Sequence, residues 1–340
     1  MKPITIIGAG LAGLALGNAL QREGVPVTIH EAGTLPRHRV CGEFICGRGA
    51  TALKELGLSA ALDGCALHKS TAWHIGQRTV LHKDLPTEAT GISRHLIDQR
   101  LAESFQKVGG HLAMNQRIQD TDLDEGRVYC NGRQLTKSSD WIGLKLHCTK
   151  LQTTADLELH LGKNGYVGLS AIENGRVNVC ALVKRNPALK APRSDWLVTY
   201  LNASGLNVVA ERIANGGIDP ESHAGVAGIE FSSIPTSKAA TLRLGDAYSV
   251  IPPFTGNGMS IALESAEITF PFILKYASGQ LDWNTAKNSI DERFHQHFDS
   301  RLRAARILHP WLSHPLGQQT LASLSRTHLL PFNLLYRLTH

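Results

Sequence analysis

The chain has 340 residues, of which 42% are hydrophobic and 19% charged, so it can bury a sizeable core and disorder is not expected. The formal charge of +6 suits anionic ligands such as phosphates, or simply a solvated surface, whereas scattered Lys and Arg without a zinc-finger or RNA-binding signature predict no nucleic-acid partner. Six cysteines without a CxxC pair and sixteen histidines without an HExxH pattern predict no metal site. Reduced thiols predict a cytoplasmic protein.

The first twenty residues are apolar enough to resemble a signal peptide. They also contain Gly8, Gly10 and Gly13, placed as a nucleotide-binding turn requires, and we therefore assign them to the folded domain. No later run is long and apolar enough to span a bilayer, so no transmembrane segment is expected.

The N-terminal pattern predicts a strand-helix-strand unit. Residues 3–7 form a β-rich run, 11–22 have helical spacing of leucines, and 25–31 form a second strand. This order is that of the first unit of a doubly wound fold. Two further helices are predicted at 48–56 and 94–108, each closed by glycine.

Short alternating strands between 141 and 183 predict a largely antiparallel sheet with one buried face. Two helical candidates follow between 194 and 214, and a strand at 226–231 is expected to return to that sheet. The chain re-enters the nucleotide-binding domain at 242–244, and a long helix at 259–276 precedes a helical C-terminal segment.

The predicted fold class is α/β: a Rossmann-type nucleotide-binding domain interleaved with a mostly antiparallel substrate domain, plus C-terminal helices. We expect the nucleotide-binding domain to comprise 1–66, 91–136 and 236–275. The substrate domain would comprise 67–90 and 137–235, and the C-terminal helical segment 276–340.

The first motif is Gly8-Ala9-Gly10-Leu11-Ala12-Gly13. In such a motif the first glycine permits a tight turn, the second lets backbone approach a pyrophosphate, and the third lets the helix pack on the strand. The phosphates then lie at the helix N-terminus, where free N–H groups favour anions. Glu31, at the end of the second strand, can hold ribose hydroxyls and would repel a 2′-phosphate.

The second motif is Leu244-Gly245-Asp246-Ala247, followed by Pro252-Pro253-Phe254-Thr255-Gly256-Asn257-Gly258-Met259 and a long helix. The aspartate can bind a sugar-alcohol chain. The helix N-terminus can stabilise negative charge on a reduced isoalloxazine ring. Alone, this motif reads as an ordinary turn; paired with the first motif, it predicts a flavin site.

Together the two motifs resemble FAD-dependent oxidoreductases of the p-hydroxybenzoate hydroxylase superfamily, which includes class A monooxygenases, geranylgeranyl reductases and flavin-dependent halogenases. The segment Val40-Cys41-Gly42-Glu43-Phe44 is similar to one that follows the second strand in the reductase and halogenase-like branch. The segment Ile92-Ser93-Arg94-His95-Leu96-Ile97-Asp98 is similar to one whose arginine lies near the flavin. The resemblance covers the chain to about residue 274.

The resemblance implies an FAD cofactor and a set of cofactor-binding residues. The ADP half would contact Gly8, Gly10, Leu11, Ala12, Gly13 and Glu31, with Arg94 as a further contact unless it serves only to start a helix. Asp246 would bind the ribitol. The flavin pyrimidine edge would be lined by Pro253, Gly256, Asn257, Gly258 and Met259. The strands between 141 and 183 would form the substrate pocket.

Some features depart from the family pattern. Class A hydroxylases carry an Asp-Gly motif, and the nearest match here is Asn131-Gly132, which we interpret as the turn of a hairpin. This weakens a prediction of direct NAD(P)H use. The WxWxIP motif of halogenases is absent, and the aromatic-proline motif of geranylgeranyl reductases is not evident.

Other polar residues lie near the expected pocket. His74, His147 and His160 fall on candidate pocket strands, where a histidine is more often packed than catalytic. No catalytic residue is assigned. The arginine- and leucine-rich segment 301–337 could dock an acidic carrier protein or a membrane surface. We favour a helical flap packed on the FAD domain, because Pro310, Pro315 and Pro331 should break a continuous surface helix.

Three functions remain open. The leading hypothesis is a monooxygenase of secondary or cofactor metabolism that hydroxylates a small organic substrate, free or carrier-bound, through a C4a-hydroperoxyflavin. Its electrons would come from NAD(P)H or a partner reductase. The second is an FAD-dependent dehydrogenase or double-bond reductase, and the third a non-catalytic nucleotide-binding accessory protein.

Overall fold

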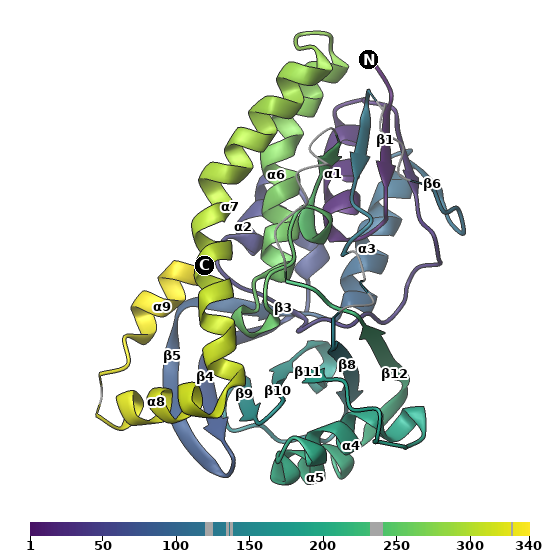
Figure 1. Cartoon of the computed structure of the whole chain (residues 1–340). Helices are drawn as coiled ribbons and strands as arrows, with labels where there is room; N and C mark the ends of the chain where they lie inside the picture. The colour runs from purple at the N-terminus through teal and green to yellow at the C-terminus, as the bar shows by residue number, and fades with distance from the viewer. Residues whose placement is uncertain (120–124, 134–135, 137–138, 232–240, 328) are drawn as a thin grey trace.

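The fold is described from a computed structural model that covers residues 1–119, 125–133, 136, 139–231, 241–327 and 329–340. Two sheets lie one above the other in Figure 1, with a long helix alongside both. The predicted boundary of the FAD domain at residue 236 lies outside the described residues. In the described part of the chain, no helix combines the length and apolarity needed to cross a membrane.

The first sheet is five-stranded and parallel throughout. Its order is β13 (Leu242–Arg243), β7 (Arg127–Tyr129), β1 (Ile4–Ile7), β2 (Val27–His30) and β6 (His111–Ala113). Ile6, Ile29 and Val128 are fully buried in the centre of this sheet. Residues buried on both faces are typical of parallel sheets, because crossover helices cover both sides.

Helices pack on this sheet and on one another: α1 (Leu11–Arg22), α2 (Gly49–Glu55), α3 (Arg94–Lys107) and α6 (Gly258–Ala277). The predicted helices at 11–22, 48–56, 94–108 and 259–276 are therefore confirmed to within two residues. Their apolar faces and the sheet share one hydrophobic core.

The second sheet has eight strands and is antiparallel except between β4 and β9. Its strands are β3 (Phe44–Ile45), β4 (Ala66–Ile75), β5 (Arg78–Gly91), β8 (Trp141–Cys148), β9 (Leu157–Gly162), β10 (Gly165–Ala171), β11 (Val177–Lys184) and β12 (Ile218–Ala227). One face packs on α4 (Trp196–Ala203) and α5 (Asn207–Ala214). These are the two helices predicted between 194 and 214. Strand β12 begins earlier than the predicted 226–231 and ends at Ala227, directly before Gly228, whose φ is 76°.

The interpretation of Asn131-Gly132 as a hairpin turn is wrong. Strand β7 before it lies in the first sheet between β13 and β1, whereas β8 after it lies in the second sheet. The two strands are not paired, so the dipeptide belongs to a crossing between sheets. Local turn chemistry did not reveal this because pairing partners are set by the whole fold.

Three C-terminal helices bridge the two sheets: α7 (Trp283–Ser313), α8 (Pro315–Arg326) and α9 (Phe332–Thr339). Helix α7 packs on α6, and its far end places Leu312 in a core shared with Leu161 and Tyr166 of the second sheet. Helix α8 contacts β5. As predicted, the C-terminal segment is not one continuous helix, and Pro315 and Pro331 mark helix starts. Pro310 by itself does not end α7, which continues for three more residues to Ser313.

Candidate active site

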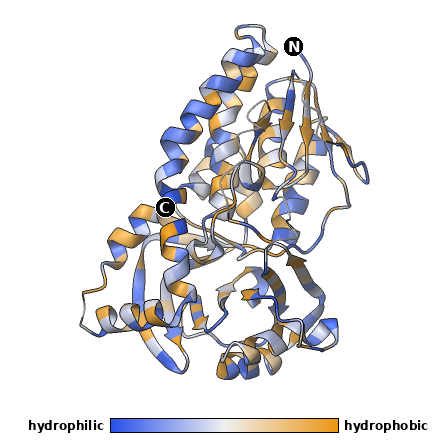
Figure 2. Ribbon diagram, in the orientation of Figure 1, coloured by the Kyte–Doolittle hydropathy of each residue, from blue (hydrophilic) through white to orange (hydrophobic). Residues whose placement is uncertain are grey.

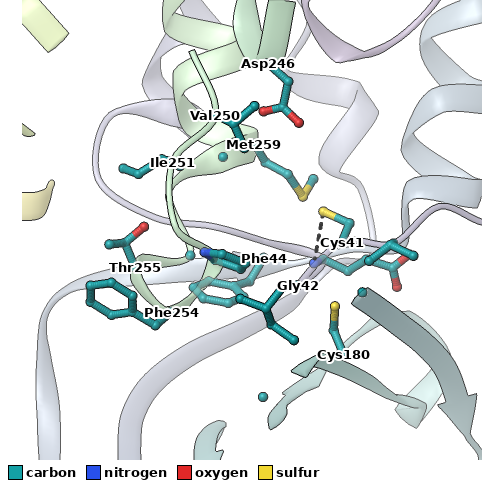
Figure 3. A pocket seen from close by; sticks show the side chains of 18 of the residues that line it. Cys41, Gly42, Phe44, Cys180, Asp246, Val250, Ile251, Phe254, Thr255 and Met259 are labelled. Carbon is teal, nitrogen blue, oxygen red and sulfur yellow. Dashed lines mark hydrogen bonds between the residues drawn. The ribbon is translucent and has the colours of Figure 1, made fainter. Parts of the chain in front are cut away.

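One cavity of about 1030 Å³ lies between the two sheets and under the C-terminal helices. Of the predicted cofactor-binding residues, the following line it: Gly8, Gly10, Leu11, Ala12, Glu31, Arg94, Asp246, Pro253, Gly256, Gly258 and Met259. Figure 3 shows part of this lining, with Asp246 and Met259 above the Cys41–Phe44 segment. Gly13 and Asn257 do not line it. Gly13 instead packs against the Gly8 backbone, and the Asn257 side chain donates a hydrogen bond to the backbone oxygen of Thr339.

The start of α1 has the shape of an anion cradle. A Cβ on Gly8, whose φ is 107°, would lie 2.4 Å from the backbone oxygen of Cys130, and one on Gly13 would lie 2.1 Å from the oxygen of Gly8. Only glycine fits either position. Gly10 caps α1 without any side-chain hydrogen bond, so the first N–H groups of the helix remain available to a ligand in the cavity.

Arginines surround this cradle. The Arg94 guanidinium comes within 3.9 Å of the Cβ position of Gly10, and Asp98 holds it through two hydrogen bonds of 3.0 and 2.8 Å. Burial alone would lower the pKa of Arg94, but the Asp98 carboxylate outweighs it and raises the pKa, so the guanidinium stays charged. Arg37 and Arg39 also line the cavity, and sequence reasoning missed both. This charge suits a pyrophosphate.

Glu31 is fixed at the end of β2 by donors from three directions. Its carboxylate accepts hydrogen bonds from the backbone N–H groups of Ala9 and Gly33, each at 3.0 Å, and from Arg37 at 2.8 Å. The side chain is nearly buried yet borders the cavity. A carboxylate held this way can accept from ribose hydroxyls.

Asp246 follows β13 on the opposite side of the cradle. Gly245 precedes it with φ 58°, and the Asp246 carboxylate lies 3.9 Å from Nε of Arg133. Arg133 in turn donates to the backbone oxygen of Val40 at 3.0 Å. Asp246 is one-third exposed, so its oxygens are free to meet a polyol.

The start of α6 forms a second cradle. Gly256 has φ 68°, and a Cβ there would lie 1.9 Å from Cζ of Phe44. The Asn257 side chain donates to the backbone oxygen of Thr339, and its own oxygen accepts no hydrogen bond from the first turn of α6. This leaves α6 without a side-chain cap, and its first N–H groups are available beside Gly258 and Met259. Such a helix end stabilises negative charge.

A charged network borders the cavity at Glu43. The sequence places this residue in the family-like segment 40–44 but does not single it out. Glu43 has φ 56°, lines the cavity and is otherwise buried. Its carboxylate lies 2.6 Å from Nε2 of His147 and 3.2 Å from Nζ of Lys145. Burial would raise the pKa of Glu43, but the His147 hydrogen bond and the Lys145 charge lower it overall.

The alternation of β8 explains why these partners meet. Ile142, Leu144 and Leu146 face α4 and α5, so Lys145 and His147 point to the opposite face, toward Glu43. Lys145 also bonds Nδ1 of His38 at 3.0 Å, and the His38 ring stacks on His95 at 4.8 Å. Burial, followed by the Lys145 charge, lowers the pKa of His38 to about 4.

His74 and His160 are stacked at 4.3 Å and do not line the cavity. Nε2 of His160 lies 2.7 Å from the carboxylate of Glu158, which also accepts from Arg212 at 3.1 Å. Among the described residues, the ligand atoms of this group and of the His38, Glu43 and His147 group lie close enough to hold a metal ion. In each group a basic side chain already pairs with the carboxylate: Lys145 with Glu43, and Arg212 with Glu158. These pairs favour the prediction of no metal site, which stays a prediction.

The remainder of the cavity is mostly apolar. Residues from both the second sheet and the C-terminal helices form this part: Trp73, Leu85, Leu157, Leu159, Leu169, Leu182, Ile229, Phe231, Ile307, Leu308, Trp311, Leu312, Leu321, Leu324, Leu330, Phe332 and Leu335. The strand residues follow the prediction of a pocket on this sheet. The helical residues were missed, because no local pattern distinguishes a helix that roofs a cavity from one packed on a core.

Comparison with known proteins gives this geometry a context. Residues 1–146 match the family of FAD binding domains. Conditioned medium factor receptor 1 of Dictyostelium discoideum is 22% identical over 317 residues, covering 78% of this chain and 62% of that protein. Squalene epoxidase 5 of Arabidopsis thaliana is 37% identical over 312 residues, covering 76% of this chain and 59% of that protein. The chain thus spans less than two thirds of either relative.

Solved structures match over nearly the whole chain. The p-nitrophenol 4-monooxygenase PnpA of Pseudomonas putida DLL-E4 has a TM-score of 0.76 at 14% identity, covering 99% of this chain and 98% of that one. A geranylgeranyl bacteriochlorophyll reductase-like protein of Thermoplasma acidophilum has a TM-score of 0.71 at 15% identity, covering 96% and 91%. At such identity the likeness establishes the fold. The predicted fold class, family resemblance and FAD cofactor are confirmed.

Proposed function

Because this chain carries an FAD-binding domain within the fold of the FAD-dependent monooxygenases, we propose that it is a monooxygenase acting on a small apolar organic substrate. The observation that carries the proposal is that one cavity joins two helix N-termini to a largely apolar chamber. Bound FAD would supply the two-electron chemistry that activates O₂. One oxygen atom would enter the substrate, and the other would leave as water with two protons and two donor electrons.

The residues around the polar end fit the cofactor. The cradle at Gly8 and Gly10, with Arg94 beside it, would hold the pyrophosphate. Glu31 would hold the ribose and Asp246 the ribitol. The uncapped start of α6, with Pro253, Gly256, Gly258 and Met259, would line the pyrimidine edge. Gly13 supports this site only by allowing α1 to pack on the preceding turn.

The chain's own groups would prepare the apolar end for reaction. Apolar side chains would hold the substrate and exclude water, which keeps reactive oxygen species from side reactions. The Glu43 carboxylate, at the cavity wall, would hold a proton-accepting position toward Nε2 of His147. Lys145 and His38 continue this network toward the half-buried ring of His95. We propose that protons exchange with the cavity along this route.

A double-bond reductase is the second candidate. The residue before Gly132 is Asn131 where class A hydroxylases carry aspartate, and the fold also matches a reductase-like protein. Anaerobic turnover separates the candidates, since only the reductase works without O₂. A colourless protein that cannot be reconstituted with FAD would support the third candidate, an accessory protein.

The test of the monooxygenase proposal uses purified, FAD-loaded protein under ¹⁸O₂ with NADH or NADPH and a panel of apolar phenols and alkenes. The expected result is a product that has gained one ¹⁸O atom. Oxidation of the donor with hydrogen peroxide as the only product, across the panel, would contradict it. Stopped-flow bleaching of the flavin identifies NAD(P)H as direct donor; its absence would assign that role to a partner reductase. Cytoplasmic location, a carrier-bound substrate and a role in secondary metabolism belong to this proposal.

A further inference from the structure

Large apolar side chains are exposed mainly in the C-terminal segment of the chain. Ten large hydrophobic residues are exposed in the described part of the chain, and six of them fall between residues 307 and 338. We call these six the C-terminal rim: Ile307, Trp311, Leu316, Leu329, Leu334 and Leu338. They are 47% to 69% exposed. Because α7 contacts both α8 and α9, the helices that carry them form one unit (Figure 1).

The charge of the same segment is one-sided. All 29 acidic residues of the chain precede Ser300, and residues 300–340 contain five arginines and no Asp or Glu. Arg303, Arg326 and Arg337 are exposed. In Figure 2 hydrophobic and hydrophilic residues alternate along α9. Exposed apolar residues interspersed with arginine are typical of helices that lie in the headgroup region of a membrane.

The C-terminal rim is continuous with the cavity. Ile307 and Trp311 are exposed and also line the cavity. Leu330 and Leu335 line it from the segment that carries Leu329, Leu334 and Leu338. The exposed apolar residues therefore lead from solvent into the apolar chamber. Packing of the C-terminal helices on the rest of the chain would not by itself require such a connection.

We propose that the C-terminal rim docks on an anionic lipid surface, and that an apolar substrate passes from the lipid into the cavity between α7 and α9. The apolar residues would insert below the headgroups while the arginines meet lipid phosphates. A lipid surface fits better than an acidic protein, since the exposed side chains of this segment include six large apolar ones with arginines among them. Docking on lipid is independent of the proposed monooxygenase function. The entry route for an apolar substrate rests on that function.

The test is co-sedimentation of the full-length, FAD-loaded protein with vesicles of phosphatidylcholine, with and without phosphatidylglycerol. We expect binding to the anionic vesicles that weakens at high salt. Arg326→Gln should lower the partition coefficient by about fivefold, the value of one basic residue near an anionic surface. The double variant Leu334→Glu/Leu338→Glu should abolish binding. Neither leucine lines the cavity, so flavin content should be unchanged.

Val208→Glu provides the matched control, because Val208 is 46% exposed on α5, away from the C-terminal rim. It should bind vesicles as the parent protein does. Equal binding of all variants, or no binding of the parent protein, would overturn the proposal. A dimer in light scattering that Leu334→Glu/Leu338→Glu dissociates would assign the rim to a second copy. Failure of oxygenation with intact vesicle binding would reject the proposed function alone.

Discussion

The carboxylate of Glu43 lies 2.6 Å from Nε2 of His147, and both side chains are completely buried. Lys145, also buried, lies 3.2 Å from the same carboxylate. A buried ion pair contributes little net stability as a pair, but losing one member leaves an uncompensated charge. This relationship joins the cavity wall to β8 and can be tested directly.

We predict that Glu43→Gln lowers the free energy of unfolding by about 3–5 kcal/mol, the typical cost of breaking a buried pair. Urea denaturation at neutral pH measures it. The double variant Glu43→Gln/Lys145→Met should recover most of the loss, because the unpaired cation is removed too. Glu88→Gln, which removes an exposed partner of Lys69, should cost less than about 1 kcal/mol. A small loss in Glu43→Gln would show that the ion pair does not form.

Asp246 provides a test of the cofactor site. Asp246→Asn removes a charged acceptor facing the cavity beside Arg133, and we expect FAD affinity to fall about 10–100-fold, as for the loss of a charge-assisted hydrogen bond. Fluorescence titration of the apoprotein with FAD measures it. The exposed Asp63 lies outside the cavity, so Asp63→Asn should bind FAD normally. Unchanged affinity in Asp246→Asn would remove this residue from the site.

Gly256 tests the close approach of Phe44. Gly256→Ala adds a Cβ that would lie 1.9 Å from the Phe44 ring and requires an alanine at φ 68°. The backbone strain alone costs about 1–2 kcal/mol. Gly205→Ala is the matched control, because Gly205 has φ 76° and nothing within 4 Å of its Cβ position.

We therefore expect Gly256→Ala to reduce thermal stability more than Gly205→Ala and to weaken FAD binding, whereas Gly205→Ala leaves FAD binding unchanged. In proteins that already carry Phe44→Ala, Gly256→Ala and Gly205→Ala should reduce thermal stability by the same amount. Equal effects of the two alanine substitutions would show that Phe44 moves aside at no cost.

His309 gives stability a defined pH dependence. Its ring packs against Trp141, Tyr166, Phe231 and Phe254, and burial, followed by the charge of Lys184, lowers its pKa from 6.5 to about 4. The unfolded chain therefore binds a proton that the folded chain does not between these pH values. Stability falls as pH drops through that window.

Between pH 6.5 and about 5 the expected contribution of His309 is on the order of 2 kcal/mol. His309→Leu should reduce the slope of the unfolding free energy over this range, measured by urea denaturation at several pH values. The slope should not vanish, because burial also lowers the pKa of His38, His74 and His340 to about 4. A steeper acid loss in His309→Leu would reverse the assigned sign.

The elements that the sequence determined are those whose signals are local. The glycines of the first motif predicted a strand, turn and helix, because each glycine answers a steric demand within a few residues of itself. Local patterns predicted α1, α3 and α6 to within two residues. Helix α3 buries one stripe of its own sequence, whereas α1 is buried on all sides from Leu11 to Leu20.

What the tertiary structure decided involves contacts across long stretches of chain. Glu43 meets His147 over 104 residues, and Asn257 meets Thr339 over 82. Asn131 lies on a crossing between sheets, although its sequence is that of a hairpin turn. Helix α7 packs on α6, as the predicted flap on the FAD domain requires, but only the complete fold shows that the C-terminal helices also roof the cavity. Spacing along the chain records which face of an element is buried, but only packing of the whole chain selects the partner that buries it.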